Sequence, residues 1–195
     1  GITLADGTLV FPTQGRDEKG TAFSNITYSK DHGKTWMTSN PAYSNVTECN
    51  AAQLSDGTVM LNMRDNRGGS RAVSTTTDLG KTWKEHESSR TALQEPVCMA
   101  SLISVKAKEN VLGKDILLFS NPNDAKNRHS ITIKASLDGG VTWLPENQLL
   151  LDAGWGWGYS CLTMIDKETV GILYESSVAH MTFQAIKLKD IIKTK

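Results

Sequence analysis

Five residues have the types and the spacing to form one site: Glu48, Arg64, Arg128, Tyr159 and Glu175. Guanidinium groups stay charged at any working pH and can bind a carboxylate through two parallel hydrogen bonds. A tyrosine, with an ordinary pKa of about 10, needs a base before it can attack near neutral pH. Each of the five alone is better explained as a surface group that aids solubility. Their convergence at one place, which their spacing predicts, favours a site.

Glu48 and Arg64 are placed by a predicted hairpin. They lie eight residues before and eight residues after Asp56. Asp56-Gly57 stands between alternating apolar runs, which is a strong signal for a tight turn. In an antiparallel pair, residues equally distant from the turn centre lie opposite each other on one face. We therefore expect Glu48 and Arg64 to be cross-strand neighbours at the open end of this hairpin.

The remaining three residues are placed by a second hairpin and by a loop. Tyr159 and Glu175 lie eight residues either side of Lys167, so a second hairpin places them opposite each other at its open end. Arg128 follows the loop 121–123 and comes just before a predicted strand at 131–134. It can therefore reach the same rim.

The elements that carry these residues repeat along the chain. SKDHGKTW at 29–36 returns as TTDLGKTW at 76–83 and as SLDGGVTW at 136–143. The Asp-Gly turn at 4–8 returns at 54–58, with a weaker version at 164–169, while the blade between them uses a longer connection around 106–114. Repeats that recur at intervals of about 50 residues are typical of β-propellers. We predict an all-β propeller of about four blades, with a β-sandwich as the alternative.

The repeated octapeptide has a structural role that its residues suggest. The Asp carboxylate can accept hydrogen bonds from nearby backbone N–H groups, and the Gly supplies a positive φ where the chain reverses. The Thr and Trp then re-enter a strand, where we expect the indole to pack between neighbouring sheets. Calcium binding is the less favoured interpretation, because each copy offers only one or two carboxylates.

The composition excludes several other functions. Lys plus Arg equals Asp plus Glu at 21 each, so nothing points to nucleic acid. No apolar run is long enough to span a membrane, and no glycine-rich phosphate loop is present. The histidines lack metal-ligand spacing, so we expect neither a metal nor a cofactor. The three cysteines, Cys49, Cys98 and Cys161, are expected to be small buried residues of strands.

The octapeptide Ser-x-Asp-x-Gly-x-Thr-Trp resembles the Asp box of sialidases, although the second copy begins with Thr76. The segments around the five polar residues resemble sialidase motifs one by one: Thr47-Glu48-Cys49-Asn50, Leu61-Asn62-Met63-Arg64, Ser120-Asn121-Pro122 ahead of Arg128, Gly158-Tyr159-Ser160 and Tyr174-Glu175. The segment 96–101 is similar to sialidases of the bacterial secreted type. The resemblance covers essentially the whole chain.

The resemblance implies an exo-α-sialidase, a glycosidase that releases terminal α-linked sialic acids from glycoproteins, glycolipids or oligosaccharides. Tyr159 is then the nucleophile and Glu48 its general base, which gives a covalent tyrosyl intermediate and net retention. Arg64 and Arg128 bind the carboxylate of sialic acid, and Glu175 braces a further arginine. A neutral tyrosine suits this substrate, because an anionic nucleophile would meet the carboxylate on the anomeric carbon.

Two tryptophans lie close in sequence to the predicted nucleophile. Trp155 and Trp157 alternate with glycines in the segment 154–158. Their rings can stack on the aglycone sugar or simply pack at the rim, and the sequence does not separate these alternatives.

Two groups that the resemblance leads us to expect are missing. The sequence has no Phe-Arg-Ile-Pro motif with the family's first arginine, and Asp17 does not match the setting of the acid/base aspartate. Sialidase propellers have six blades, and about four are present. We therefore expect 1–195 to be the C-terminal portion of a sialidase propeller, with the N-terminal part of that propeller as its partner. Alone it should be poorly soluble and inactive.

The sequence also leads to expectations about the cellular location of the protein and about its exact activity. A bacterial sialidase of this type is expected to be secreted, periplasmic or on the cell surface. A non-catalytic Asp-box propeller that binds sugars or proteins is the rival class. A trans-sialidase, which passes the sialyl group to a sugar, is a third possibility that product analysis with added lactose would separate.

Overall fold

The computed structural model describes residues 1–193, which form antiparallel sheets and very little helix. The first sheet contains β1 (Ile2–Thr3), β2 (Leu9–Arg16), β3 (Ala22–Ser29), β4 (Met37–Thr38) and β5 (Tyr43–Ser44). The second contains β6 (Val46–Gln53), β7 (Val59–Asp65), β9 (Ala72–Thr76) and β10 (Lys84–Glu85). The third contains β12 (Ser101–Val105), β13 (Ile116–Pro122), β14 (His129–Ser136) and β15 (Gln148–Trp155). The fourth contains β16 (Ser160–Met164), β17 (Thr169–Tyr174) and β18 (Thr182–Lys187).

A small two-stranded sheet joins β8 (Gly69–Ser70) to β11 (Gln94–Glu95). The helical pieces are short: η1 (Ala107–Glu109), η2 (Pro145–Asn147) and α1 (Leu188–Ile191). Across residues 1–193, no helix is long and apolar enough to cross a membrane.

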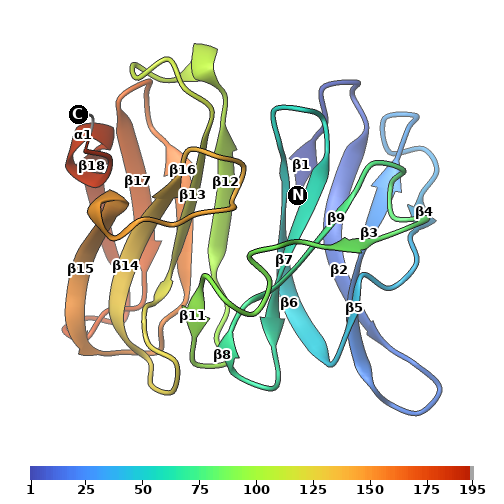
Figure 1. Ribbon diagram of the computed structural model, residues 1–195, viewed down its shortest axis with the longest axis horizontal. Helices are drawn as coiled ribbons and strands as arrows, with labels where there is room; N and C mark the ends of the chain where they lie inside the picture. Colours follow the sequence, from blue (N-terminus) through green and yellow to red (C-terminus); the bar gives the residue numbers. More distant parts are fainter. Residues whose placement is uncertain (194–195) are drawn as a thin grey trace.

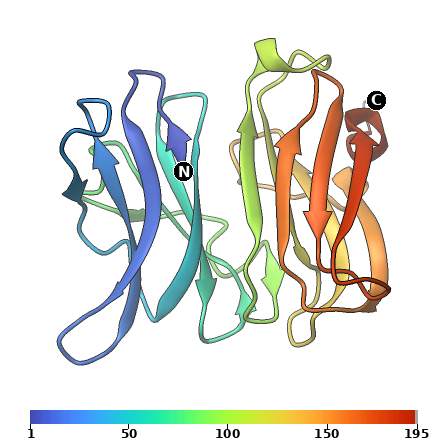
Figure 2. The same cartoon turned by 180° about the vertical axis from the view of Figure 1, so that it is seen from behind.

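The four larger sheets stand side by side, as Figures 1 and 2 show from opposite faces. Within each sheet the main strands are paired in chain order, from β1 to β4, β6 to β10, β12 to β15 and β16 to β18. Strand β6 lies beside β2 and β12, and β12 lies beside β16. The first strands of the second, third and fourth sheets are therefore neighbours in turn, and β2 of the first sheet lies next to them, as in a propeller. The predicted all-β propeller of about four blades is confirmed, as is the longer connection between β12 and β13.

Apolar side chains from neighbouring sheets fill the space between them. One cluster joins the first and second sheets, a second joins the second and third, and another joins the third and fourth. Burying one such aliphatic or aromatic side chain contributes about 1.5–3 kcal/mol. The packing between sheets therefore fixes how each sheet is turned relative to the next.

Each repeated octapeptide forms the predicted turn. In the first copy, the Asp31 carboxylate accepts hydrogen bonds from the backbone N–H of Thr35 at 2.8 Å and from its hydroxyl at 2.6 Å. These bonds, together with one from Ser29, lower the pKa of Asp31 to about 2. The second and third copies repeat the bonds with Asp78 and Asp138. The octapeptide is a structural brace.

The three box tryptophans differ in their packing. Trp143 is buried in the cluster between the second and third sheets, and Trp83 packs against the cluster between the first and second. Trp36 remains 43% exposed and contacts Phe11 at a ring-centroid distance of 5.4 Å. The prediction that the indole packs between sheets is correct for two copies and wrong for Trp36, whose side of the first sheet is not covered by another sheet of residues 1–193.

The expectation that all three cysteines are buried in strands is wrong. Cys98 is buried, but it lies in the loop before β12; Cys49 on β6 is half-buried. Cys161 on β16 is exposed, because alternate residues of a strand point to opposite faces and its neighbour Leu162 occupies the packed face. All three are free thiols.

A lysine is buried between the second and third sheets. Lys134 on β14 is only 2% exposed, and its amine lies 5.7 Å from the centroid of the Phe119 ring. Burial, and to a smaller extent the charge of Arg71, lower the pKa of Lys134 to about 7 from an ordinary 10.5. The charged lysine therefore destabilises the fold.

We predict that Lys134→Met raises the melting temperature near neutral pH by several degrees. Between pH 7 and 10.5 the unfolded chain holds a proton that the folded lysine has lost, so the stability of the native protein rises with pH across this window. Below pH 7 the folded lysine is protonated as well, so the cost of burying its charge is present in full. Calorimetry against pH should show a gain for Lys134→Met that shrinks toward pH 10.5, whereas the exposed-lysine control Lys30→Met should show none. A pH-independent difference would contradict the prediction.

Candidate functional site

The predicted neighbours Glu48 and Arg64 are confirmed, although the hairpin is irregular at this point. Cys49 on β6 pairs with Met63 on β7 and Val46 pairs with Asp65, so Thr47 and Glu48 together lie opposite Arg64. This arrangement of two residues against one is a β-bulge. Arg64 Nη1 still contacts Glu48 Oε2, so the bulge does not separate the pair.

The second hairpin has the expected register as well. Ser160 on β16 pairs with Tyr174 on β17, and the backbone N–H of Glu175 donates to the carbonyl of Tyr159 at 2.9 Å. These open ends lie at the end of the sheets where the small β8–β11 sheet is found (Figure 1).

Three of the predicted residues meet directly, although they come from the second and fourth sheets. The Tyr159 hydroxyl donates to Glu48 Oε1 at 2.8 Å. Arg64 Nη1 lies 2.5 Å from Glu48 Oε2 and 3.3 Å from Tyr159 Oη. All three side chains are half-buried. The arrangement is a phenol hydrogen-bonded to a carboxylate, with a guanidinium touching both.

The electrostatics of this trio keep the phenol protonated. Burial raises the pKa of Tyr159, and the hydrogen bond and charge of Glu48 raise it further, while Arg64 opposes them. Burial works against the charge of Arg64, but the ion pair with Glu48 outweighs it and raises the pKa of Arg64. The resting trio therefore contains a neutral tyrosine and a charged arginine.

Arg128 also reaches this place. Its guanidinium carbon lies 5.8 Å from the centroid of the Tyr159 ring. Nη1 donates to the carbonyl of Trp157 and Nη2 to the carbonyl of Val97, both at 3.0 Å. These two bonds fix the plane of the guanidinium and leave its other N–H donors for a ligand. Both predicted arginines therefore flank Tyr159.

Glu175 lies in the site, but its contacts are local. Its Oε2 accepts the backbone N–H of Tyr159 at 3.0 Å, which ties the two strands together behind the phenol. No hydrogen bond or ion pair joins it to an arginine in residues 1–193, so its predicted role as a brace for another arginine stays a prediction. In residues 1–193, no hydrogen bond or ion pair joins Asp17 to the five site residues; its Oδ1 accepts the N–H groups of Lys19 and Thr21 within its own turn.

The glycines of the segment 154–158 allow close backbone packing. A side chain at Gly158 would lie 2.6 Å from Pro122, and the φ of Gly158 is 88°. A side chain at Gly154 would lie 2.4 Å from Ser177. Trp155 and Trp157 between them are 60% and 58% exposed, and their ring centroids are 5.5 Å apart. The segment is tightly held while presenting two indoles at the surface.

Sequence reasoning missed the buried ion pair behind the site. Arg71 and Glu95 are fully buried and lie 3.2 Å apart. The only signal for Arg71 was a charged residue next to the apolar pair Ala72-Val73, and Glu95 gave no periodic signal at all.

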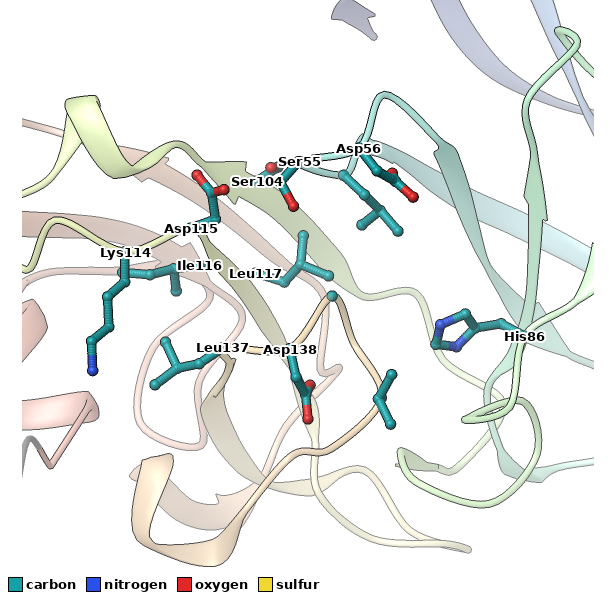
Figure 3. A pocket seen from close by; sticks show the side chains of 13 residues that line it. Ser55, Asp56, His86, Ser104, Lys114, Asp115, Ile116, Leu117, Leu137 and Asp138 are labelled. Atoms are coloured by element: carbon teal, nitrogen blue, oxygen red, sulfur yellow. The ribbon is translucent and has the colours of Figure 1, made fainter.

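A cavity elsewhere does not contain the site. A pocket has a volume of about 580 Å³. Its walls include Asp56, His86 and Asp138, as Figure 3 shows. It lies at the turn end of the β6–β7 hairpin, and none of the five predicted site residues lines it. We place the site at the open ends of the hairpins, where the phenol, carboxylate and guanidinium groups contact one another.

Comparisons with known proteins agree with the sequence motifs. The BNR repeat-like domain family matches residues 1–172. The chain is 71% identical to a sialidase of Bacteroides fragilis over 193 residues, which is 99% of this chain and 36% of that protein. It is 36% identical to a sialidase of Micromonospora viridifaciens over 151 residues, 76% of this chain and 23% of that protein. The resemblance to bacterial sialidases is confirmed.

Solved structures give the same result. The Hadza microbial sialidase Hz136 is 66% identical and superposes with a TM-score of 0.95 over 98% of this chain and 37% of that one. The intramolecular trans-sialidase of Ruminococcus gnavus, at 20% identity and a TM-score of 0.76, shares the fold. The chain thus spans little more than a third of the length of its Bacteroides and Hadza relatives.

We predict that Glu48→Gln lowers the pKa of Tyr159, because the carboxylate's charge disfavours the phenolate, and that Arg64→Gln raises it. The tyrosinate absorbance measured against pH, with Tyr159→Phe to identify the signal, checks both shifts. Glu85→Gln is the matched control, because Glu85 accepts a hydrogen bond from Tyr43 and should leave Tyr159 unaffected. An unchanged pKa of Tyr159 in Glu48→Gln would show that Glu48 does not contact the phenol, and a rise would contradict the predicted sign.

Proposed function

The chain belongs to the family of BNR repeat-like domains, and from that premise we propose that it is part of the catalytic propeller of an exo-α-sialidase acting on terminal sialic acids of glycoconjugates. The observation that carries the proposal is the hydrogen bond between Tyr159 and Glu48, beside both Arg64 and Arg128. The high identity to bacterial sialidases over nearly the whole chain supports it.

In the proposed first step, Tyr159 Oη forms a bond to the anomeric carbon as the bond to the aglycone oxygen breaks. The phenolic proton passes to Glu48 Oε1, which already accepts it in a hydrogen bond. The raised pKa of Tyr159 means that the phenol stays protonated until attack, so the proton transfer accompanies bond formation. The departing aglycone oxygen needs a proton from an acid.

In the second step, water attacks the anomeric carbon, and the same acid, now a base, takes its proton. The tyrosyl oxygen leaves and recovers its proton from Glu48. Two displacements at one carbon give net retention.

The two arginines would hold the substrate carboxylate. Arg64 and Arg128 lie on either side of Tyr159, and a guanidinium binds a carboxylate with directed, charge-assisted hydrogen bonds. A neutral phenol can approach the anomeric carbon beside that carboxylate, whereas a second anion would be repelled. Glu175 keeps the phenol in place through the backbone of Tyr159.

The acid/base group and a third arginine would come from residues outside this sequence, in a longer protein of which 1–195 is the C-terminal part of the propeller. We propose that Glu175 also braces that arginine. The sequence preceding Gly1 in the full-length protein decides the matter: it should contain an arginine in a Phe-Arg-Ile-Pro motif followed by an aspartate. Without them, the acid/base assignment is wrong.

Tyr159→Phe in the full-length protein should reduce hydrolysis of a fluorogenic sialoside by on the order of a thousandfold or more, because the nucleophilic oxygen is removed. Binding of free sialic acid should persist, since the arginines remain. Tyr43→Phe is the matched control, because Tyr43 also donates to a glutamate, at 3.0 Å, but in the first sheet. Undiminished turnover in Tyr159→Phe would favour a non-catalytic or different site.

We further propose that Trp155 and Trp157 contact the aglycone sugar. Changing both to Ala should raise KM for sialyllactose about tenfold, the equivalent of losing about 1.4 kcal/mol of stacking. The affinity for free sialic acid, which has no aglycone, should be unchanged. Trp36→Ala, an exposed tryptophan of the first sheet, is the control. An equal loss for both ligands would contradict an aglycone role.

A further inference from the structure

Glu95 is a fully buried carboxylate that makes three hydrogen bonds. Oε1 accepts the backbone N–H of Asp65 at 2.8 Å. Oε2 accepts the backbone N–H of Cys98 at 2.9 Å and Nη1 of Arg71 at 3.2 Å. One side chain on β11 therefore ties together two backbone segments that are far apart in the sequence.

Arg71 completes the connection from the other side. Its Nη1 also donates to the carbonyl of Cys98 at 2.7 Å, and its Nε donates to Asn62 Oδ1 at 2.7 Å. The N–H and the C=O of Cys98 are thus both held by the Glu95–Arg71 pair. The backbone of Cys98 has no freedom to rotate without breaking a buried charge-assisted hydrogen bond.

Both tied segments adjoin an arginine of the site. Asp65 directly follows Arg64, and Val97 directly precedes Cys98. The carbonyl of Val97 accepts Arg128 Nη2 at 3.0 Å. The carboxylate of Glu95 therefore binds the residue that follows Arg64 in the sequence. It also binds the residue that follows Val97, whose carbonyl accepts Arg128.

Val97 is held in an unfavourable conformation. Its φ is 51°, in the left-handed region that β-branched residues rarely adopt. Such strain persists only where the surroundings impose it. Here the next residue is fixed by Glu95 and Arg71, which turns the Val97 carbonyl toward Arg128.

We infer that the buried Glu95–Arg71 pair positions both arginines and so sets how tightly the site binds a carboxylate. A buried ion pair is weak evidence for stabilisation, because desolvation of the two charges offsets their attraction. Its contacts with Asp65 and Cys98 give it a geometric role instead. Glu95 and Arg71 are positioning residues that do not touch the substrate, and the inference rests on the function proposed above.

The test uses Glu95→Gln and the double variant Arg71→Met/Glu95→Met in the full-length protein. Gln retains one acceptor oxygen but places an NH2 donor against the N–H of Asp65 or Cys98. The double variant removes both charges, so the fold does not have to bury an unpaired one. We expect the Kd for free sialic acid, by calorimetry, to rise about tenfold in each, and KM to rise with it.

The readouts separate positioning from simple loss of fold. Partial unfolding lowers the number of binding sites and the apparent kcat but leaves Kd and KM unchanged, whereas misplaced arginines raise both. Glu168→Gln, which breaks the exposed 2.8 Å pair with Lys187, is the matched control and should match wild type. A Kd within twofold of wild type in either variant overturns the inference. A wild-type protein that does not bind sialic acid overturns the proposed function instead.

Discussion

The hydrogen bond between Tyr159 and Glu48 joins residues 111 positions apart, in sheets that are not neighbours. Glu48 lies in the second sheet and Tyr159 at the start of the fourth, and the third sheet stands between them. The 2.8 Å contact therefore depends on how the third sheet is turned against both of its neighbours. The two apolar clusters on its faces set those turns, so the packing of the core controls the chemistry of the rim.

The repeated Asp boxes also help to set the angles between neighbouring sheets. Their carboxylates are consumed by hydrogen bonds within the turn, which leaves them no chemical role. The indole of Trp143 is buried between the second and third sheets, where it contacts Phe119 at a ring-centroid distance of 5.8 Å. The box thus contributes to the angle between sheets on which the distant site depends.

The pairings within each hairpin could be predicted from the sequence because a strand alternates faces with a period of two and a tight turn fixes the register. That reasoning placed Glu48 opposite Arg64 and Tyr159 opposite Glu175. The bulge at Thr47 and Glu48 had no sequence signal, but Glu48 and Arg64 remain in contact. Local periodicity determines these positions, so one sequence was sufficient.

Contacts between sheets were not predictable in the same way. Whether Glu48 touches Tyr159, or Glu95 touches Arg71, depends on rotations and loop paths that leave no periodic pattern. The exposure of Trp36 and Cys161 has the same origin, since a strand residue is buried only if a neighbouring sheet covers its face. The chemical roles of the site residues come from the resemblance and the proposal, because periodicity places a side chain without assigning it a reaction.

The site combines rigidity with an electrostatic balance. Arg64 contacts both partners of the phenol–carboxylate pair, and its charge favours the phenolate that Glu48 disfavours. Small displacements of Arg64 would therefore alter both the binding of an anion and the proton affinity of Tyr159. A guanidinium on a long flexible side chain holds such a position only if its surroundings are fixed. The tied Asp65 backbone and the close-packed glycines of 154–158 supply that rigidity. The network behind the arginines is thus as much a condition for the proposed chemistry as the residues that would touch the sugar.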